Sequence, residues 1–244
     1  MTVPESATAS TALRNIRSFV RREGRMTRAQ ELALANHWAQ FGCEYRRAQI
    51  DLAQLFGRDA PCVLDIGCGM GQATLALAKR YPHRNFLTIE VHRPGVGSLL
   101  HGIVANNLHN IRVLSHDSVE VIRDMLPPTS IEQALVYFPD PWPKKRHHKR
   151  RLLNTNFARR LHGCMQNHGR IYIATDWADY AEQIPAAFEA NGYTNLAGAG
   201  RPTLRPHWRP LTKFEQRGLR LGHAVFDFAF RPMRVLPQTA GESR

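Results

Sequence analysis

The chain has 244 residues, and 43% of them are hydrophobic, a proportion that suits one soluble domain with a substantial core. Lys and Arg total 33 against 20 Asp and Glu, and the resulting net charge of +13 favours a polyanionic partner such as nucleic acid. The sequence excludes a membrane-spanning protein, because no apolar run approaches the roughly 20 residues of a span. A secreted protein is not expected either, since the N-terminus has no apolar signal segment.

The four cysteines, Cys43, Cys62, Cys68 and Cys164, are scattered and form no C-x-x-C pair. Free thiols of this kind are typical of a reducing compartment, so a cytoplasmic protein is expected. The twelve histidines show no metal-binding spacing, and no metal site is predicted.

Three regions are predicted along the chain. Residues 1–26 form a flexible basic arm, because arginines recur there with few apolar partners. Residues 27–232 form a single domain, which begins with a helix whose N-terminus carries the capping-box pair Thr27 and Gln30. Residues 233–244 form a disordered tail.

From residue 62 the chain alternates short apolar runs with helical patterns. Strands are predicted at 62–67, 85–90, 111–115, 134–138 and 170–176, and helices at 71–80, 95–108, 117–125, 153–165 and 177–192. This alternation predicts an α/β fold with a mostly parallel sheet covered by helices on both faces. Segments 193–198 and 223–231, with no helix predicted between them, suit an antiparallel hairpin at the sheet edge.

Polar residues and glycines follow the first three strands, where ligands of open α/β sheets bind. Asp65 ends the first strand, and Gly67, Gly69 and Gly71 follow it at alternating positions. Glu90 ends the second strand and can accept both hydroxyls of a ribose. Asp117 follows the third strand and can accept from an adenine amine. A glycine loop with three such acids fits S-adenosylmethionine better than NAD, since the third glycine comes one residue earlier than the G-x-G-x-x-G pattern requires.

The stretch FPDPWPKKRHHKRR (138–151) follows the fourth strand and joins one carboxylate to a run of cations. Pro139 and Pro141 restrict the backbone around Asp140, and Trp142 can stack on a base. The cations that follow suit the phosphates of a nucleic acid. Asp140 is therefore expected to face the chemistry, as a fixed and dry carboxylate that favours positive charge on a target base.

The sequence resembles the bacterial tRNA (guanine-N7-)-methyltransferase family, often called TrmB. The resemblance covers roughly residues 14 to 232 and rests on RSFVRREGR, DIGCGMGQ, IEVHRPGVG, HDSVEV, FPDPWPKKRHHKRR, ATDW and PLTKFEQRGLRLGH. It implies a Rossmann-like class I S-adenosylmethionine-dependent methyltransferase that acts on tRNA. The implied product is 7-methylguanosine in the variable loop, at position 46 of tRNA.

The resemblance also implies residue roles. The methyl donor would be bound by Asp65, Gly67, Gly69, Gly71, Glu90, Asp117 and Asp140, and Asp140 would be the catalytic residue. Substrate would be bound by Lys144, Asp176, Thr212, Lys213, Phe214 and Glu215. RNA would lie against Arg146, His147, His148, Lys149, Arg150 and Arg151. Many relatives carry Glu in place of Asp65, and the shorter acid is expected to reach the methionine amine only through water.

Guanine differs from adenine in having two adjacent donors, N1–H and the N2 amino group. A carboxylate can accept from both, so Asp176 or Glu215 is predicted to select guanine. Two other functions stay open: an RNA-binding protein with a non-catalytic methyltransferase fold, and an adenine amino-methyltransferase. Both monomer and homodimer also stay open.

Overall fold

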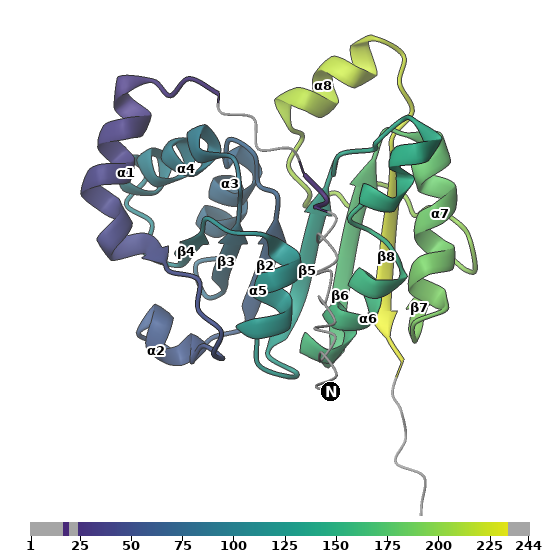
Figure 1. The fold of residues 1–244 in the computed structure, drawn as a ribbon, viewed down its shortest axis with the longest axis horizontal. Helices are drawn as coiled ribbons and strands as arrows, with labels where there is room; N and C mark the ends of the chain where they lie inside the picture. Colours follow the sequence, from purple (N-terminus) through teal and green to yellow (C-terminus); the bar gives the residue numbers. More distant parts are fainter. Residues whose placement is uncertain (1–16, 20–23, 234–244) are drawn as a thin grey trace, which may run out of the picture.

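The structure is a computed structural model that describes residues 17–19 and 24–233. Most of the predicted basic arm, residues 1–16 and 20–23, and residues 234–244 of the predicted tail lie outside the described residues. The described part contains a sheet of eight strands flanked by helices (Figure 1).

Residues 42–232 supply the strands of the sheet, whose spatial order is β1-β4-β3-β2-β5-β6-β8-β7. In chain order they are β1 (Gly42–Cys43), β2 (Cys62–Ile66), β3 (Asn85–Ile89), β4 (Ile111–Leu114), β5 (Ile131–Tyr137), β6 (Met165–Thr175), β7 (Tyr193–Asn195) and β8 (Phe226–Pro232). Strands β1 to β6 pair in parallel, whereas β8 is antiparallel to β6 and β7 is antiparallel to β8. The predicted parallel sheet with an antiparallel edge hairpin is confirmed.

The helices are α1 (Arg28–Phe41), α2 (Leu52–Phe56), α3 (Gln72–Arg80), α4 (Arg93–Ala105), α5 (Ser118–Asp124), η1 (Lys145–Arg150, a 3-10 helix), α6 (Thr155–Cys164), α7 (Ala178–Glu189) and α8 (Lys213–Arg220). The capping box at the start of α1 is confirmed: Thr27 accepts from the Gln30 N–H, and Gln30 accepts from the Thr27 N–H. The prediction that no helix lies between the two edge strands is wrong, because α8 lies there.

Two apolar clusters hold the helices on the two faces of the sheet. Side chains of α1, α3 and α4 pack with Val63, Phe86 and Leu135 on one face. Side chains of α5, α6 and α7 pack with Leu64 and Ala134 on the other. Neighbouring strand residues alternate between the clusters because successive side chains of a strand point to opposite faces.

The carboxyl ends of the parallel strands meet at one edge of the sheet, at the top of Figure 1. The loops after β2, β3, β4, β5 and β6 therefore lie at the same edge, and α8 lies above it. Helix α2 marks the opposite, amino edge. Each acid that the sequence analysis places after a strand is thus brought to one side of the molecule.

Candidate functional site

Two adjoining hollows open at the carboxyl edge, and Gly67, Tyr137 and Phe138 line both of them. The Glu90 hollow is lined further by Ser18, Phe19, Ile66, Ile89, Glu90, Val91, His116, Ser118, Pro139, Asp140 and Leu152. The Asp65 hollow is lined further by Asp65, Cys68, Gly69, Met70, Gln72, Ala73, Ser98 and Thr212. Their volumes of about 200 and about 540 Å³ together fall in the range of roughly 300–1,000 Å³ that small-molecule sites occupy.

The loop after β2 leaves room for a ligand at two of its three glycines. Gly67 and Gly69 have φ angles of +75° and +57°, and a Cβ atom at either position would meet no atom within 4 Å. Backbone with this conformation and no side chain lets a ligand approach closely. Gly71 differs, since a Cβ there would lie 2.7 Å from Leu99 Cδ1. Gly71 therefore serves the packing of α3 on α4 rather than the cradle.

Glu90 fastens the glycine loop to the end of β3. Its carboxylate is buried, and its two oxygens accept hydrogen bonds from the backbone N–H groups of Gly69 (2.7 Å) and His92 (2.8 Å). Burial raises the pKa of Glu90, and these two hydrogen bonds limit the rise. Each carboxylate oxygen can accept a further hydrogen bond, so the group remains able to bind a hydroxyl.

Asp65 lies in the wall of the second hollow and is 4% exposed. The hydroxyl of Thr74 donates to its Oδ2 atom. Burial raises the pKa of Asp65 to about 6, with a further contribution from the negative charge of Glu90, and the Thr74 hydrogen bond opposes both. A cationic group entering this hollow would favour the ionised form.

Asp117 caps helix α5, since its Oδ1 atom accepts from the Val119 N–H at 2.9 Å. The residues on either side of it, His116 and Ser118, line the Glu90 hollow. His116 stacks on Tyr45 with ring centroids 3.7 Å apart, and its Nε2 lies 2.6 Å from Glu120 Oε2. His116 was missed as a candidate, although it directly precedes the predicted acid.

Asp140 lies at the rim of the Glu90 hollow, at the end of a constrained turn. Phe138 and Trp142 both have positive φ angles, +53° and +47°, which are uncommon for residues other than glycine. The expectation of a dry carboxylate is wrong for the free protein, because Asp140 is exposed. Exclusion of water from Asp140 would have to come from bound substrates.

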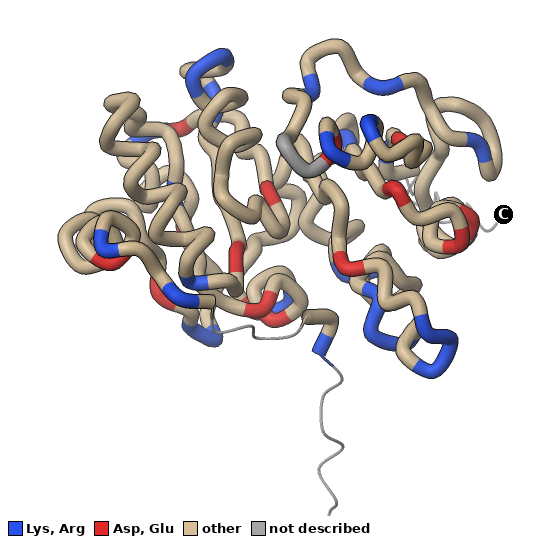
Figure 2. The backbone as a smooth tube through the Cα atoms, turned by 90° about the horizontal axis from the view of Figure 1, so that it is seen from above, with Lys and Arg blue, Asp and Glu red and all other residues tan. Residues whose placement is uncertain are grey.

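The cation run after Asp140 forms the short helix η1, and its Lys and Arg side chains differ in exposure. Lys144, Lys145, Arg146 and Lys149 are exposed, and Figure 2 shows a run of basic positions along a protruding loop. Partial desolvation and the charges of Arg146 and Arg150 lower the pKa of His147, which favours the neutral imidazole. His148 is half-buried and lies 3.4 Å from the Asp179 carboxylate.

Arg151 does not belong to that exposed surface, and the prediction that it meets RNA is not supported. Its side chain is 1% exposed. The guanidinium donates to the Pro141 carbonyl oxygen (2.8 Å), to Gln183 Oε1 (2.9 Å) and to Asp179 Oδ2 (2.8 Å). Arg151 therefore ties the beginning and the end of the 141–151 segment to helix α7.

Trp142 lies among protein groups at the start of the basic segment. Arg150 Cζ lies 4.4 Å from the centroid of its ring, and His147 meets the ring edge-on at 5.9 Å. The indole N–H donates to the Ser18 carbonyl oxygen at 3.0 Å, which brings residues 17–19 to the Glu90 hollow. Stacking of a base on Trp142 would have to compete with Arg150 for one face of the ring.

Asp176, after β6, is partly exposed at the same edge of the sheet. It does not cap helix α7, whose N-cap is Trp177, and its Oδ2 lies 3.9 Å from His223 Nδ1. Thr212 lines the Asp65 hollow and caps α8 by accepting from the Glu215 N–H. The side chains of Lys213 and Phe214 lie outside the described residues.

Glu215 is another candidate that the structure places differently from the expectation. Its carboxylate is 1% exposed, and both oxygens accept from Arg209, at 2.7 Å each. Arg205 also donates to it at 3.2 Å, and Asp227 lies 2.9 Å from Arg209 Nε. A carboxylate engaged in this way is not available to read a guanine edge, so Glu215 is not retained as the guanine-selecting group.

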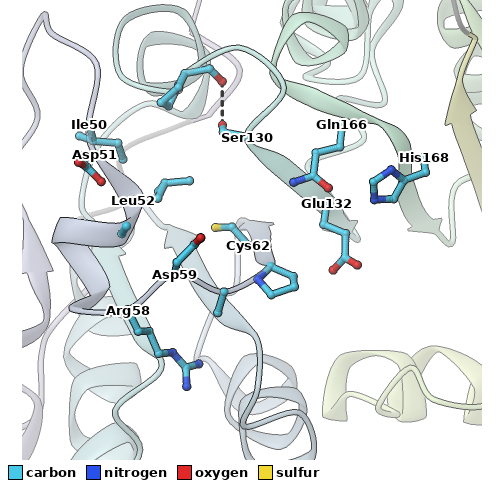
Figure 3. A pocket seen from close by; sticks show the side chains of 14 residues that line it. Ile50, Asp51, Leu52, Arg58, Asp59, Cys62, Ser130, Glu132, Gln166 and His168 are labelled. Carbon is cyan, nitrogen blue, oxygen red and sulfur yellow. Dashed lines mark hydrogen bonds between the residues drawn. The ribbon is translucent and has the colours of Figure 1, made fainter.

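A further hollow, of about 660 Å³, lies at the amino edge (Figure 3). Two of its acids have structural roles: Asp51 caps α2, and Glu132 lies 3.6 Å from Arg84. Ser130 donates to the Pro127 carbonyl oxygen, the contact drawn in Figure 3. Because open α/β sheets bind ligands at the other edge, the carboxyl-edge hollows are the better candidate site.

Neither a metal site nor a membrane span is found among the described residues. No group of three or more His, Cys, Asp or Glu side chains among them is placed to hold a metal ion. Within residues 17–19 and 24–233, no helix has the length and apolar character needed to cross a membrane.

Comparisons with known proteins identify the family of the chain. A family model described as "Putative methyltransferase" matches residues 59–228. The tRNA (guanine-N(7)-)-methyltransferase of Edwardsiella ictaluri is 48% identical over 220 residues, which cover 90% of this chain and 92% of that protein. The enzyme of the same name from Salmonella choleraesuis is 46% identical over 232 residues, with 95% and 97% covered.

Solved structures share the fold at low sequence identity. The 16S rRNA methyltransferase KamB has a TM-score of 0.55 and 16% identity, and the match covers 78% of this chain and all of that one. The aminoglycoside resistance methyltransferase NpmB1 has a TM-score of 0.53 and 13% identity, with 78% and 95% covered.

Proposed function

Because this chain belongs to the family of tRNA (guanine-N(7)-)-methyltransferases, we propose that it transfers a methyl group from S-adenosylmethionine to N7 of a guanine in the tRNA variable loop. One observation supports this most: an open glycine cradle, an acid suited to a ribose and the rim carboxylate Asp140 meet at one sheet edge, beside an exposed basic segment. A tRNA substrate also agrees with the cytoplasmic location that the scattered cysteines predict.

The residues at the two hollows fit the donor. Gly67 and Gly69 leave open space beside the backbone, and Glu90 can accept from ribose hydroxyls in the first hollow. The raised pKa of Asp65 indicates a buried acid without a full ionic partner, and a cationic amine of the donor would supply one. Asp117 lines neither hollow but lies between His116 and Ser118, which line the Glu90 hollow; it caps α5 with one oxygen, and the other could accept from an adenine amine.

Replacing Glu90 with Gln is expected to weaken donor binding by about 1.5–3 kcal/mol, the usual loss for hydrogen bonds to a charged group, and to affect tRNA binding less. An amide has only one accepting oxygen, whereas Glu90 uses both of its oxygens already on Gly69 and His92. Titration calorimetry with S-adenosylhomocysteine measures the loss. The matched control is Glu132→Gln, which changes an acid at the opposite edge; equal affinity of the Glu90 variant and the control would refute the ribose role.

Methyl transfer to guanine N7 requires the protein to align the two reactants and to stabilise the charge that develops on the ring. Guanine N7 has an in-plane lone pair and carries no proton at neutral pH, so no general base is required. The donor supplies an electrophilic methyl carbon on a sulfonium group. Asp140, held between Pro139 and Pro141, favours the positive charge that the guanine ring gains.

Selection of guanine is assigned to Asp176 in this proposal. Of the two acids considered for that role, Asp176 is partly exposed and Glu215 is engaged by Arg209. Asp176 and Asp140 follow adjacent strands, since Tyr137 and Ala174 are register partners. Lys144 is exposed between Asp140 and η1, which supports its proposed role as a substrate contact.

The exposed cations of the basic segment are proposed to hold tRNA phosphates. Replacing both Arg146 and Lys149 with Gln is expected to lower the affinity for all tRNAs alike. The slope of log affinity against log salt concentration is expected to become shallower by about 0.7–0.9 for each phosphate that the variant no longer neutralises. The control pair is Lys79 and Arg80, exposed at the end of α3 near the amino edge. Filter binding over a range of salt concentrations gives the slope for each double variant. The same slope in the Arg146/Lys149 variant and the control variant would show that the segment is only a solvated surface.

The proposed function is tested by mass analysis of nucleosides from unmodified tRNA incubated with the protein and S-adenosylmethionine. Appearance of 7-methylguanosine is the expected result. Methylation of an adenine amino group would instead identify an adenine methyltransferase. Binding of tRNA without methylation would identify a non-catalytic RNA-binding protein.

A further inference from the structure

Tyr137, the last residue of β5, carries a buried hydroxyl without a hydrogen-bond partner. Five other buried side-chain polar atoms of the described residues also make no hydrogen bond, on Arg84, Thr88, Glu132, Thr203 and Arg209. Two of the five face an opposite charge: Arg209 Nε lies 2.9 Å from Asp227, and Glu132 Oε2 lies 3.6 Å from Arg84. None of those five residues lines either carboxyl-edge hollow, whereas Tyr137 lines both. The unpartnered hydroxyl therefore coincides with the proposed donor site.

A buried hydroxyl without a partner is unfavourable, costing about 1–3 kcal/mol, and such groups are rare in native proteins. Burial, followed by the negative charge of Asp65, raises the pKa of Tyr137 well above its ordinary value. The group is therefore a phenol at neutral pH and can donate one hydrogen bond. A hydroxyl kept in this state at a ligand site is suited to a ligand acceptor.

The position of Tyr137 indicates which part of the donor it meets. Asp65 pairs with Leu135 in the parallel register, and Tyr137 lies two residues further on, so Asp65 and Tyr137 lie on the same face of the sheet. Both line the Asp65 hollow, whereas Glu90 lines the other. With the ribose at Glu90, the amino-acid tail of the donor lies toward Asp65 and Tyr137.

The chemistry of the tail divides the roles in that hollow. Asp65 is an acid and suits the ammonium group of the tail. The Tyr137 phenol donates a hydrogen bond, and an ammonium group has no acceptor to offer it. The remaining group of the tail is its carboxylate.

We propose that Tyr137 is a donor-binding residue whose hydroxyl donates a hydrogen bond to the α-carboxylate of S-adenosylmethionine. This inference rests on the proposed function, since it requires the donor to occupy both hollows. It adds a residue of β5 that directly precedes the Phe138–Asp140 turn.

The test compares two ligands that differ only in the tail. S-adenosylhomocysteine has the amino acid, and 5′-methylthioadenosine has the same nucleoside and thioether without it. Calorimetry is expected to show that Tyr137→Phe lowers the affinity for S-adenosylhomocysteine by about 10-fold or more. This is the usual effect of losing a hydrogen bond to a charged group. The affinity for 5′-methylthioadenosine is expected to stay unchanged.

The matched control is Tyr172→Phe. Tyr172 is the register partner of Leu135 on the neighbouring strand, its ring meets Trp208 edge-on at 4.7 Å, and it lines neither hollow. Without ligand, Tyr137→Phe is expected to be as stable as the wild type or more stable in urea, because it removes an unpartnered group.

Three results would overturn the proposal. Unchanged affinity of Tyr137→Phe for S-adenosylhomocysteine would show that the hydroxyl contacts no donor atom. Equal losses for both ligands would place the hydroxyl on the nucleoside instead of the tail. If wild-type protein bound neither ligand, the proposed function itself would fail, and this outcome is distinct from the other two.

Discussion

Replacing Asp140 with Asn slows methyl transfer by about 10²–10³, the usual effect of removing one well-placed electrostatic group from an active site. The carboxylate lies at the rim of the Glu90 hollow, beside the opening through which a base would enter. Asparagine has nearly the same size as aspartate and should preserve the turn, but it removes the negative charge that is proposed to stabilise the methylated ring. Donor and tRNA affinities should change little, because the loss is confined to the transition state.

Single-turnover methylation at saturating donor and tRNA measures this rate directly. Asp59→Asn is the control, since Asp59 is an exposed acid at the opposite edge of the sheet. If Asp140→Asn reacts as fast as the Asp59 variant, Asp140 has no part in the chemical step.

Replacing Arg209 with Gln destabilises the protein by about 3–5 kcal/mol, the range for breaking a buried ion pair. The side chain of Arg209 is 0% exposed and joins Glu215 to Asp227, so its loss leaves two buried carboxylates without their main partner. Burial alone would lower the pKa of Arg209, but the two acids reverse the shift and raise it. The charged form of Arg209 is therefore part of the folded structure.

Arg205 provides the control because it contacts the same Glu215 from the surface, with 35% of its side chain exposed. Solvent screens that pair, so Arg205→Gln is expected to cost about 1 kcal/mol or less. Urea unfolding at pH 7 gives both values. An equal decrease in the free energy of unfolding for the two variants would mean that the burial of Arg209 adds nothing to stability.

The five central strands and their helices were predictable because each strand is a continuous apolar run and each helix has an apolar stripe. Strand β1 and helix α2 escaped prediction because segments of two and five residues are too short to show a period. Helix α8 had a readable signal: Thr212 and Glu215 have the same spacing as the capping pair of α1. The same glutamate was interpreted as a substrate ligand instead.

The site residues that proved different were charged side chains whose surroundings come from distant segments. Nothing local distinguishes Arg151 from Arg150, yet Arg151 is buried against Asp179 and Gln183 of α7. Likewise, the partners of Glu215 include Arg209 six residues earlier, and Asp227 joins the same cluster from β8. A sequence motif locates such residues at the site, but tertiary contacts decide which of them face solvent.

The contacts of Arg151 have a consequence for how the protein meets RNA. A surface loop of consecutive cations would normally repel itself and sample many shapes, and ordering it on RNA would cost about 0.5–1.5 kcal/mol for each immobilised side chain. Here one arginine turned inward fixes both ends of the segment to α7 before any RNA arrives. Much of the backbone entropy is thus lost during folding and not during association, and in the proposed complex the remaining cations would meet the phosphates already arranged relative to Asp140.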